Sequence, residues 1–95
     1  MSQSLLVFLA NGFEEIEVVV PVDLWRRGGI EVVTASITEK KEVMGAHGIL
    51  FQADALLSKL VVEAFDAVYL PGGSGGVEQL LADTRIAPIL RQTLQ

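Results

Sequence analysis

The sequence contains no cysteine, and this absence removes several kinds of chemistry from the 95 residues themselves. Disulfides, thiolate nucleophiles and cysteine-based metal sites all need the missing sulfur. Histidine is nearly absent as well, because His47 is the only one, and a single histidine makes neither a metal site nor a proton relay. We therefore expect no metal and no cofactor, and we interpret His47 as an exposed loop residue.

Basic residues are scarce, since 7 Lys and Arg face 12 Asp and Glu and give a formal net charge of −5. They form no cluster that could read phosphates, so we expect no nucleic-acid partner. Long hydrophobic runs are also missing. The apolar segment 5–10 is too short for a signal-peptide core with its flanks and far too short to span a bilayer. We expect a cytoplasmic protein without a membrane partner.

Hydrophobic residues, by contrast, make up 51% of the chain, which is a large share for 95 residues. A single domain of this size buries only about 60–65% of its unfolded surface. Either a partner extends the core, or part of the domain is missing from this sequence.

A glycine-rich turn organises the second half of the chain. Residues 65–70 are typical of a short buried strand, Pro-Gly-Gly-Ser-Gly-Gly follows at 71–76, and residues 77–81 favour a helix. Sites in α/β proteins lie beyond the carboxyl ends of strands, where glycines expose N–H groups to an anion or oxyanion. The alternative is a tight connection that needs positive φ. No Lys-Ser or Lys-Thr follows, so the turn is not a P-loop, and Ser74 lacks the context of a serine-hydrolase elbow.

Residues 13–27 predict a helix, because acids fill its first turn, arginines its last, and two glycines follow. Its apolar residues fall on two nearly opposite faces, so we expect the sheet on one side and a second subunit or a missing piece on the other. The two faces are Phe13, Ile16, Val20 and Leu24, and Val18, Val22 and Trp25.

Pro21 lies inside this helix and removes the N–H that would bond the carbonyl of Glu17. We expect a kink there, and Glu17 is the residue that such a kink would position. The alternative is that Glu17 is an ordinary surface acid.

The remaining segments complete an α/β pattern. They are strands at 5–10 and 30–36, a hairpin of 43–44 with 49–51, a short helix at 55–60, and a last helix over 86–94 that Asp83-Thr84 caps. Only three parallel strands are clear, whereas a doubly wound domain usually has about five. The sequence therefore looks like the front half of a larger domain.

Four pieces of the chain together resemble the ThiJ/PfpI family, in its branch of small deglycase and chaperone-like proteins. They are residues 11–17 after the opening strand, 21–30, 32–36 and 66–73. The resemblance implies a flavodoxin-like doubly wound parallel sheet, akin to class I glutamine amidotransferases. Residues 1–95 would be the N-terminal part of one such domain, with its reactive cysteine beyond the chain end.

By the same resemblance, Glu17 is the carboxylic acid that hydrogen-bonds the cysteine sulfur. Gly73, with Gly72 second, supplies a backbone N–H to the oxyanion site. The implied activity is glyoxalase- or deglycase-like, on small carbonyl compounds or glycated thiols and amines, with a role in oxidative stress. No residue here supports the family's peptidase or thiazole-biosynthesis labels, and we expect residues 1–95 alone to be inactive.

The resemblance also implies a homodimer through the first helix, which would employ Val18, Val22 and Trp25. Two other functions remain open. The chain could be a non-enzymatic chaperone-like or interaction module that exposes apolar faces. It could also be a small α/β domain that binds an anion at residues 72–76.

Overall fold

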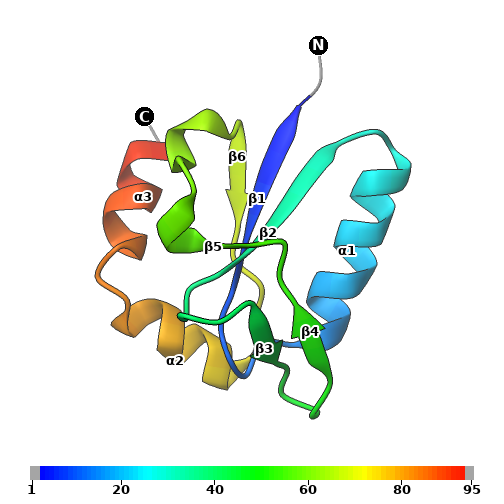
Figure 1. Ribbon diagram of the computed structural model, residues 1–95, viewed down its shortest axis with the longest axis vertical. Coiled ribbons are helices and arrows are strands. Elements are labelled where there is room, and N and C mark those ends of the chain that lie inside the picture. The colour runs from blue at the N-terminus through cyan, green and yellow to red at the C-terminus, as the bar shows by residue number, and fades with distance from the viewer. Residues whose placement is uncertain (1–2, 94–95) are drawn as a thin grey trace.

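The computed structural model describes residues 3–93, and a four-stranded parallel sheet runs through its middle in the order β5-β2-β1-β6 (Figure 1). Strand β1 (Ser4–Leu9) pairs with β2 (Glu31–Ser36) on one side and with β6 (Ala67–Tyr69) on the other. Strand β5 (Ala55–Leu56) pairs with the outer side of β2. The strand with the longest apolar run, β1, is therefore an inner strand, as expected for a strand covered on both faces.

Helices cover both faces of this sheet. Figure 1 shows α1 (Glu15–Arg27) on one side, and α2 (Ser74–Ala82) and α3 (Ile86–Thr93) on the other. All three helices are predicted from the sequence, although α2 begins three residues earlier than its glycines suggested. Glycine disfavours helix interiors, so propensity alone placed the start too late. Leu94, the last residue of the expected final helix, lies outside the described residues.

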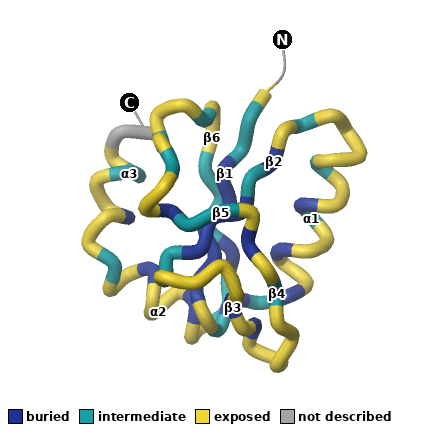
Figure 2. The backbone as a smooth tube through the Cα atoms, viewed as in Figure 1, coloured by how far each residue is buried: buried dark blue, intermediate teal, exposed yellow. Residues whose placement is uncertain are grey.

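The core consists of two clusters, one on each side of the sheet, because successive side chains of a strand point to opposite faces. Val7 of β1 packs in the cluster that contains Val18 of α1. Leu6 and Phe8 pack in the other cluster, with Leu80 of α2. In Figure 2 the buried stretches accordingly gather along the central strands.

A short hairpin packs beside the start of α1. Strands β3 (Glu42–Met44) and β4 (Leu50–Gln52) pair antiparallel, which confirms the predicted hairpin. Phe13 anchors it, since its ring meets that of Phe51 edge-on at a centroid distance of 5.9 Å and its backbone bridges to Gly45.

The helix expected at 55–60 is wrong. Ala55 and Leu56 instead form the parallel strand β5 against β2, followed by two single 3₁₀ turns, η1 (Leu57–Lys59) and η2 (Val62–Ala64). Pairing with β2 satisfies backbone groups that a short isolated helix would have left open. The sheet therefore has four parallel strands rather than three.

The assignment of the two faces of α1 is also corrected. Val18 and Val22 are buried, and the Trp25 ring packs edge-on against Tyr69 with centroids 5.2 Å apart, so the sheet covers this face. It cannot serve as the partner contact that we expected. Of the other set, Ile16 (70% exposed), Val20 (49%) and Leu24 (61%) are exposed, whereas Phe13 is buried. Val19 (47%), which belonged to neither set, adds to the exposed apolar surface.

The loop between β1 and α1 lies directly against the N-terminus of α2. A Cβ on Gly12 would sit 2.9 Å from the backbone nitrogen of Gly76, and one on Gly73 would sit 2.7 Å from the carbonyl oxygen of Gly12. Gly73 also has a φ of +106°, so it needs glycine for its conformation as well as for space. Both reasons for glycine therefore apply at this turn.

Substituting Gly12 tests how tightly this loop packs. Gly12 and Gly29 have similar positive φ values of +93° and +87°, but nothing lies within 4 Å of a Cβ on Gly29. Gly12→Ala and Gly29→Ala should share a conformational strain of about 1–3 kcal/mol. Gly12→Ala should lose a further amount of about 1–3 kcal/mol through steric overlap with α2. Urea unfolding would measure both, and equal losses would contradict the tight contact.

Candidate functional site

Glu17 and the glycine turn meet, although 55 residues separate them in the sequence. The N–H of Gly72 donates a hydrogen bond of 3.1 Å to Oε1 of Glu17. A Cβ on Gly72 would lie 2.6 Å from the same oxygen, so a side chain at this position would displace the Glu17 carboxylate. Glu17 is an exposed residue, and it is nevertheless more than a solvated surface acid because its carboxylate has a fixed partner.

Gly73 stands next in the chain, at the point where α2 begins. Its carbonyl accepts the N–H of Val77 at 2.8 Å, whereas its own N–H has no acceptor among residues 3–93. An open N–H at a helix N-terminus suits a negatively charged oxygen. The structure thus brings together the three residues singled out in the sequence, Glu17, Gly72 and Gly73.

One more backbone bond fixes the turn to α1. The N–H of Glu14, just before the helix, donates to the carbonyl of Gly72 at 3.0 Å. Two hydrogen bonds therefore join the turn to the start of α1, since Gly72 donates to Glu17 and accepts from Glu14.

An open apolar cavity of about 230 Å³ adjoins this turn. It lies between the end of β6, α2 and α3, and its lining includes Leu70, Gly72, Leu80 and Ile86. Strand β6 is the outer strand of the sheet here, with β1 as its only strand neighbour among the described residues. The site therefore opens onto a sheet edge with apolar surroundings.

Glu15 forms a second polar cluster that sequence reasoning missed. Its side chain is buried, and its Oε2 accepts N–H bonds from His47 (2.8 Å) and Ile49 (3.3 Å). Nδ1 of His47 lies 2.9 Å from Oε1 of Glu15 and 3.2 Å from Oε1 of Glu14. A Cβ on Gly45 would overlap the Glu15 carboxylate. His47 is exposed, as expected, but it is not without partners.

This cluster changes the ionisation of both partners. Burial by itself raises the pKa of Glu15, but hydrogen bonds from the His47 side chain and from three backbone N–H groups outweigh it and lower the pKa to about 2. The pKa of His47 is raised, first by its hydrogen bond to Glu15 and then by the charges of Glu14 and Glu15. Charged Glu15 therefore holds the hairpin loop against the start of α1.

Glu14, Glu15 and His47 are also the residues that could contact a metal ion. Each offers one ligand atom, and the three atoms lie within 4.8 Å of one another. The ion pair already occupies these atoms, so the arrangement is explained without a cation.

Across residues 3–93, no helix is both long and apolar enough to cross a bilayer.

Comparison with known proteins finds relatives of this chain. Residues 3–95 match the DJ-1/PfpI family. Protein DJ-1 homolog B of Arabidopsis thaliana is 42% identical over 79 residues, which cover 83% of this chain and 18% of that protein. Protein dj-1beta of Drosophila melanogaster is 35% identical over 91 residues, which cover 96% of this chain and 49% of that protein.

Solved structures agree with the sequence matches. The crystal structure of the VC2308 protein has a TM-score of 0.91 and 37% sequence identity, over 96% of this chain and 46% of that one. The resemblance drawn from the sequence and the α/β fold class are therefore confirmed. The chain spans half or less of the length of each of these relatives.

The ion pair between Glu15 and His47 can be tested by titration. We expect the His47 ring to titrate above its ordinary pKa of about 6.5. In Glu15→Gln its pKa should fall toward that value, because the charge beside the ring is gone. NMR of the ring protons measures this, and Glu63→Gln, which removes an exposed acid elsewhere, is the control. An unchanged His47 titration in Glu15→Gln would contradict the pair.

The same pair predicts a pH window for stability. The folded pKa of Glu15 is depressed, so its contribution is present above about pH 4.5 and is lost as the pH falls toward 2. The folded pKa of His47 is raised, so its contribution is full below about pH 6.5 and is lost as the pH rises through that pKa. Thermal unfolding of the protein and Glu15→Gln should differ most between about pH 4.5 and 6.5.

Proposed function

The chain belongs to the DJ-1/PfpI family, and we propose that the full-length protein is a cytoplasmic enzyme that acts on small carbonyl compounds. The reaction is glyoxalase- or deglycase-like, uses a cysteine thiolate, and limits damage by reactive aldehydes under oxidative stress. The observation that carries this proposal is the hydrogen bond of 3.1 Å from Gly72 to Glu17, beside the open N–H of Gly73. No cysteine is among the 95 residues, so the sulfur comes from further sequence of the full-length protein.

The chemistry assigns a task to each residue. The thiolate adds to the aldehyde carbon of a 2-oxoaldehyde, a C–S bond forms, and the π electron pair of the carbonyl moves to its oxygen. The N–H of Gly73 stabilises that oxyanion. Oε1 of Glu17 is held by Gly72, which leaves Oε2 to exchange a proton with the reacting atoms. The hydrogen on that carbon then moves as a proton to the neighbouring carbonyl carbon, which gives a thioester of the 2-hydroxy acid and oxidises the aldehyde carbon as the ketone is reduced. Water cleaves the C–S bond of the thioester, which releases the 2-hydroxy acid and the thiolate, so no outside oxidant is needed.

A non-enzymatic role as an interaction module is the second candidate. The apolar cavity beside Gly72 and the exposed Leu81 (82%) on α2 support it, because uncovered apolar surface favours association. Anion binding at residues 72–76 has less support. The loop between β1 and α1, which contains Gly12, packs against this end of α2 and occupies space that an anion would need.

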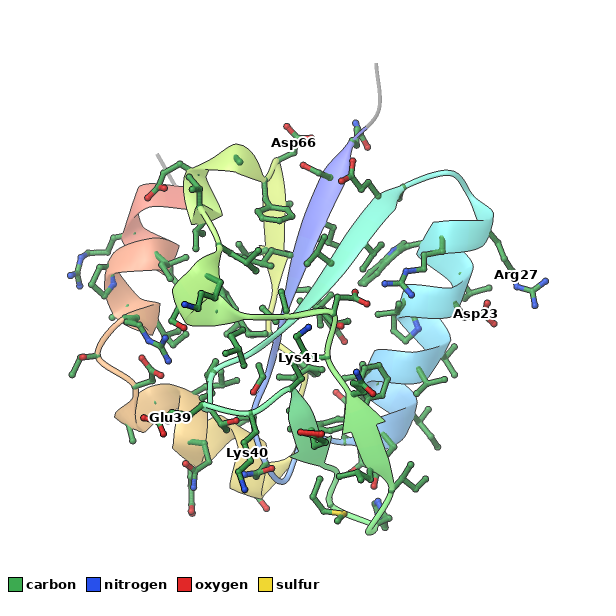
Figure 3. The ribbon with its side chains drawn as sticks, viewed as in Figure 1. Asp23, Arg27, Glu39, Lys40, Lys41 and Asp66 are labelled. Carbon is green, nitrogen blue, oxygen red and sulfur yellow. The ribbon has the colours of Figure 1, made fainter. Side chains whose placement is uncertain are left out.

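We also propose a homodimer through α1, with a contact surface different from the one first expected. Ile16, Val20 and Leu24 form an exposed apolar stripe on the side away from the sheet. An ion pair of 2.9 Å between Asp23 and Arg27 lies beside it on the outer surface (Figure 3). A self-complementary apolar stripe with a polar border suits a two-fold contact between identical helices.

The role of Glu17 can be tested in the full-length protein with a 2-oxoaldehyde such as methylglyoxal. Glu17→Gln keeps an oxygen that can accept the N–H of Gly72, but it cannot transfer a proton. We expect kcat to fall by about 10²-fold or more. Glu78→Gln, an exposed acid of α2, should leave the rate unchanged. An undiminished rate in Glu17→Gln would exclude Glu17, and no turnover by the unmodified, folded protein would exclude the activity itself.

The dimer contact can be tested by sedimentation equilibrium. The combined substitution of Val20→Lys and Leu24→Lys places two charges in the apolar stripe and should convert a dimer to a monomer. Val61→Lys changes a residue that is 66% exposed elsewhere and should leave the mass unchanged. A monomeric unmodified protein, or a dimer that survives both lysines, would contradict the contact.

A further inference from the structure

The carbonyl of Glu17 lacks its normal helical partner. In an α-helix the N–H of residue i+4 bonds the carbonyl of residue i. Residue i+4 of Glu17 is Pro21, which has no N–H. Helix α1 nevertheless runs from Glu15 to Arg27 without interruption. This carbonyl therefore has no hydrogen-bond donor within the helix. It belongs to Glu17, whose carboxylate is the proposed catalytic acid.

Tyr69 supplies that donor from the sheet. Its hydroxyl donates a hydrogen bond of 2.9 Å to the carbonyl oxygen of Glu17. The phenol ring is held edge-on against Trp25, with centroids 5.2 Å apart and ring planes at 79°. The ring thus has a fixed place between β6 and α1.

The ionisation of Tyr69 fits the role of a donor. Burial raises the pKa of the Tyr69 hydroxyl, and the negative charge of Glu17 raises it further. The hydroxyl therefore keeps its proton at neutral pH. A phenolate would have no hydrogen to donate to the carbonyl.

Residues 69–72 therefore hold Glu17 at two points. Tyr69 binds its backbone carbonyl, and Gly72, three residues later, binds its carboxylate. Fixing both ends of a residue restricts the directions in which its side chain can point. We propose that Tyr69 is a positioning residue for Glu17, acting through the carbonyl that Pro21 leaves without its helical donor. This inference rests on the proposed function in its catalytic part, but the contact can be tested without any activity.

A double-mutant cycle tests the contact. Tyr69→Phe removes the hydroxyl and keeps the ring. Pro21→Ala restores an N–H that can bond the carbonyl of Glu17, so the hydroxyl should then matter less. In urea unfolding we expect Tyr69→Phe to raise the unfolding equilibrium constant about fivefold when Pro21 is present, and less than twofold when residue 21 is alanine. Equal effects in the two backgrounds would overturn the inference.

Ser4→Ala is the matched control. The Ser4 hydroxyl accepts the N–H of Asp66 at 3.2 Å and donates to the Asp66 carboxylate at 3.3 Å, so this variant also loses side-chain hydrogen bonds near β6, but none to α1. Figure 3 shows Asp66 at the end of the sheet beside the start of β1. The cost of Ser4→Ala should be the same with proline or alanine at position 21.

Hydrogen exchange of the Gly72 amide gives a second measurement, which needs no Pro21 variant. Loss of the tyrosine hydroxyl should loosen Glu17 and speed exchange of the Gly72 N–H severalfold, whereas Ser4→Ala should not change it. Unchanged exchange in Tyr69→Phe would overturn the inference even if the Pro21→Ala variants do not fold.

The catalytic part is tested by turnover of methylglyoxal in the full-length protein. Tyr69→Phe should lower kcat about tenfold with little change in KM, and Pro21→Ala should restore part of the loss. Full kcat in Tyr69→Phe would overturn the positioning role. If the unmodified protein is inactive, the proposed function fails, whereas the unfolding cycle and the Gly72 exchange still decide whether Tyr69 holds Glu17.

Discussion

The close approach of two backbone segments is the constraint on which the rest of this structure depends. The loop after β1 and the turn after β6 touch at distances that admit no side chain at Gly12 or Gly73. This contact fixes where α1 begins relative to α2, and these two helices cover opposite faces of the sheet. Glu17 and Gly72 can meet because the segments that carry them are already pressed together at this point.

Most of the fold could be predicted because it follows local patterns. Apolar runs marked the strands, and charges and glycines marked the ends of α1. The errors arose where tertiary contacts decide. Strand β5 has only two residues, and it exists because β2 offers an edge to pair with. The faces of α1 were both apolar, so periodicity alone could not say which one the sheet would cover.

The site was predictable in part and for a different reason. Family resemblance pointed to Glu17, Gly72 and Gly73, whereas residue type alone favoured a surface acid and a plain turn. Glu15 escaped notice because a glutamate in a first helical turn already has an ordinary explanation. Its one available signal was Gly45, a glycine that leaves room for a buried carboxylate. The partner of Tyr69 is a backbone carbonyl, and sequence patterns of side chains do not show such a contact.

The strand order has a consequence for how the chain is synthesised. Central β1 comes first along the sequence, yet its register pairs Val7 with Tyr69, which follows 62 residues later. At about 5–20 residues per second, a ribosome needs roughly 3–12 s to make the intervening segment. During that interval one edge of β1 has no strand to pair with, and parallel pairing cannot begin from a local turn. The edge of β1 that β6 covers in the folded protein therefore stays open until the chain has been made as far as Tyr69.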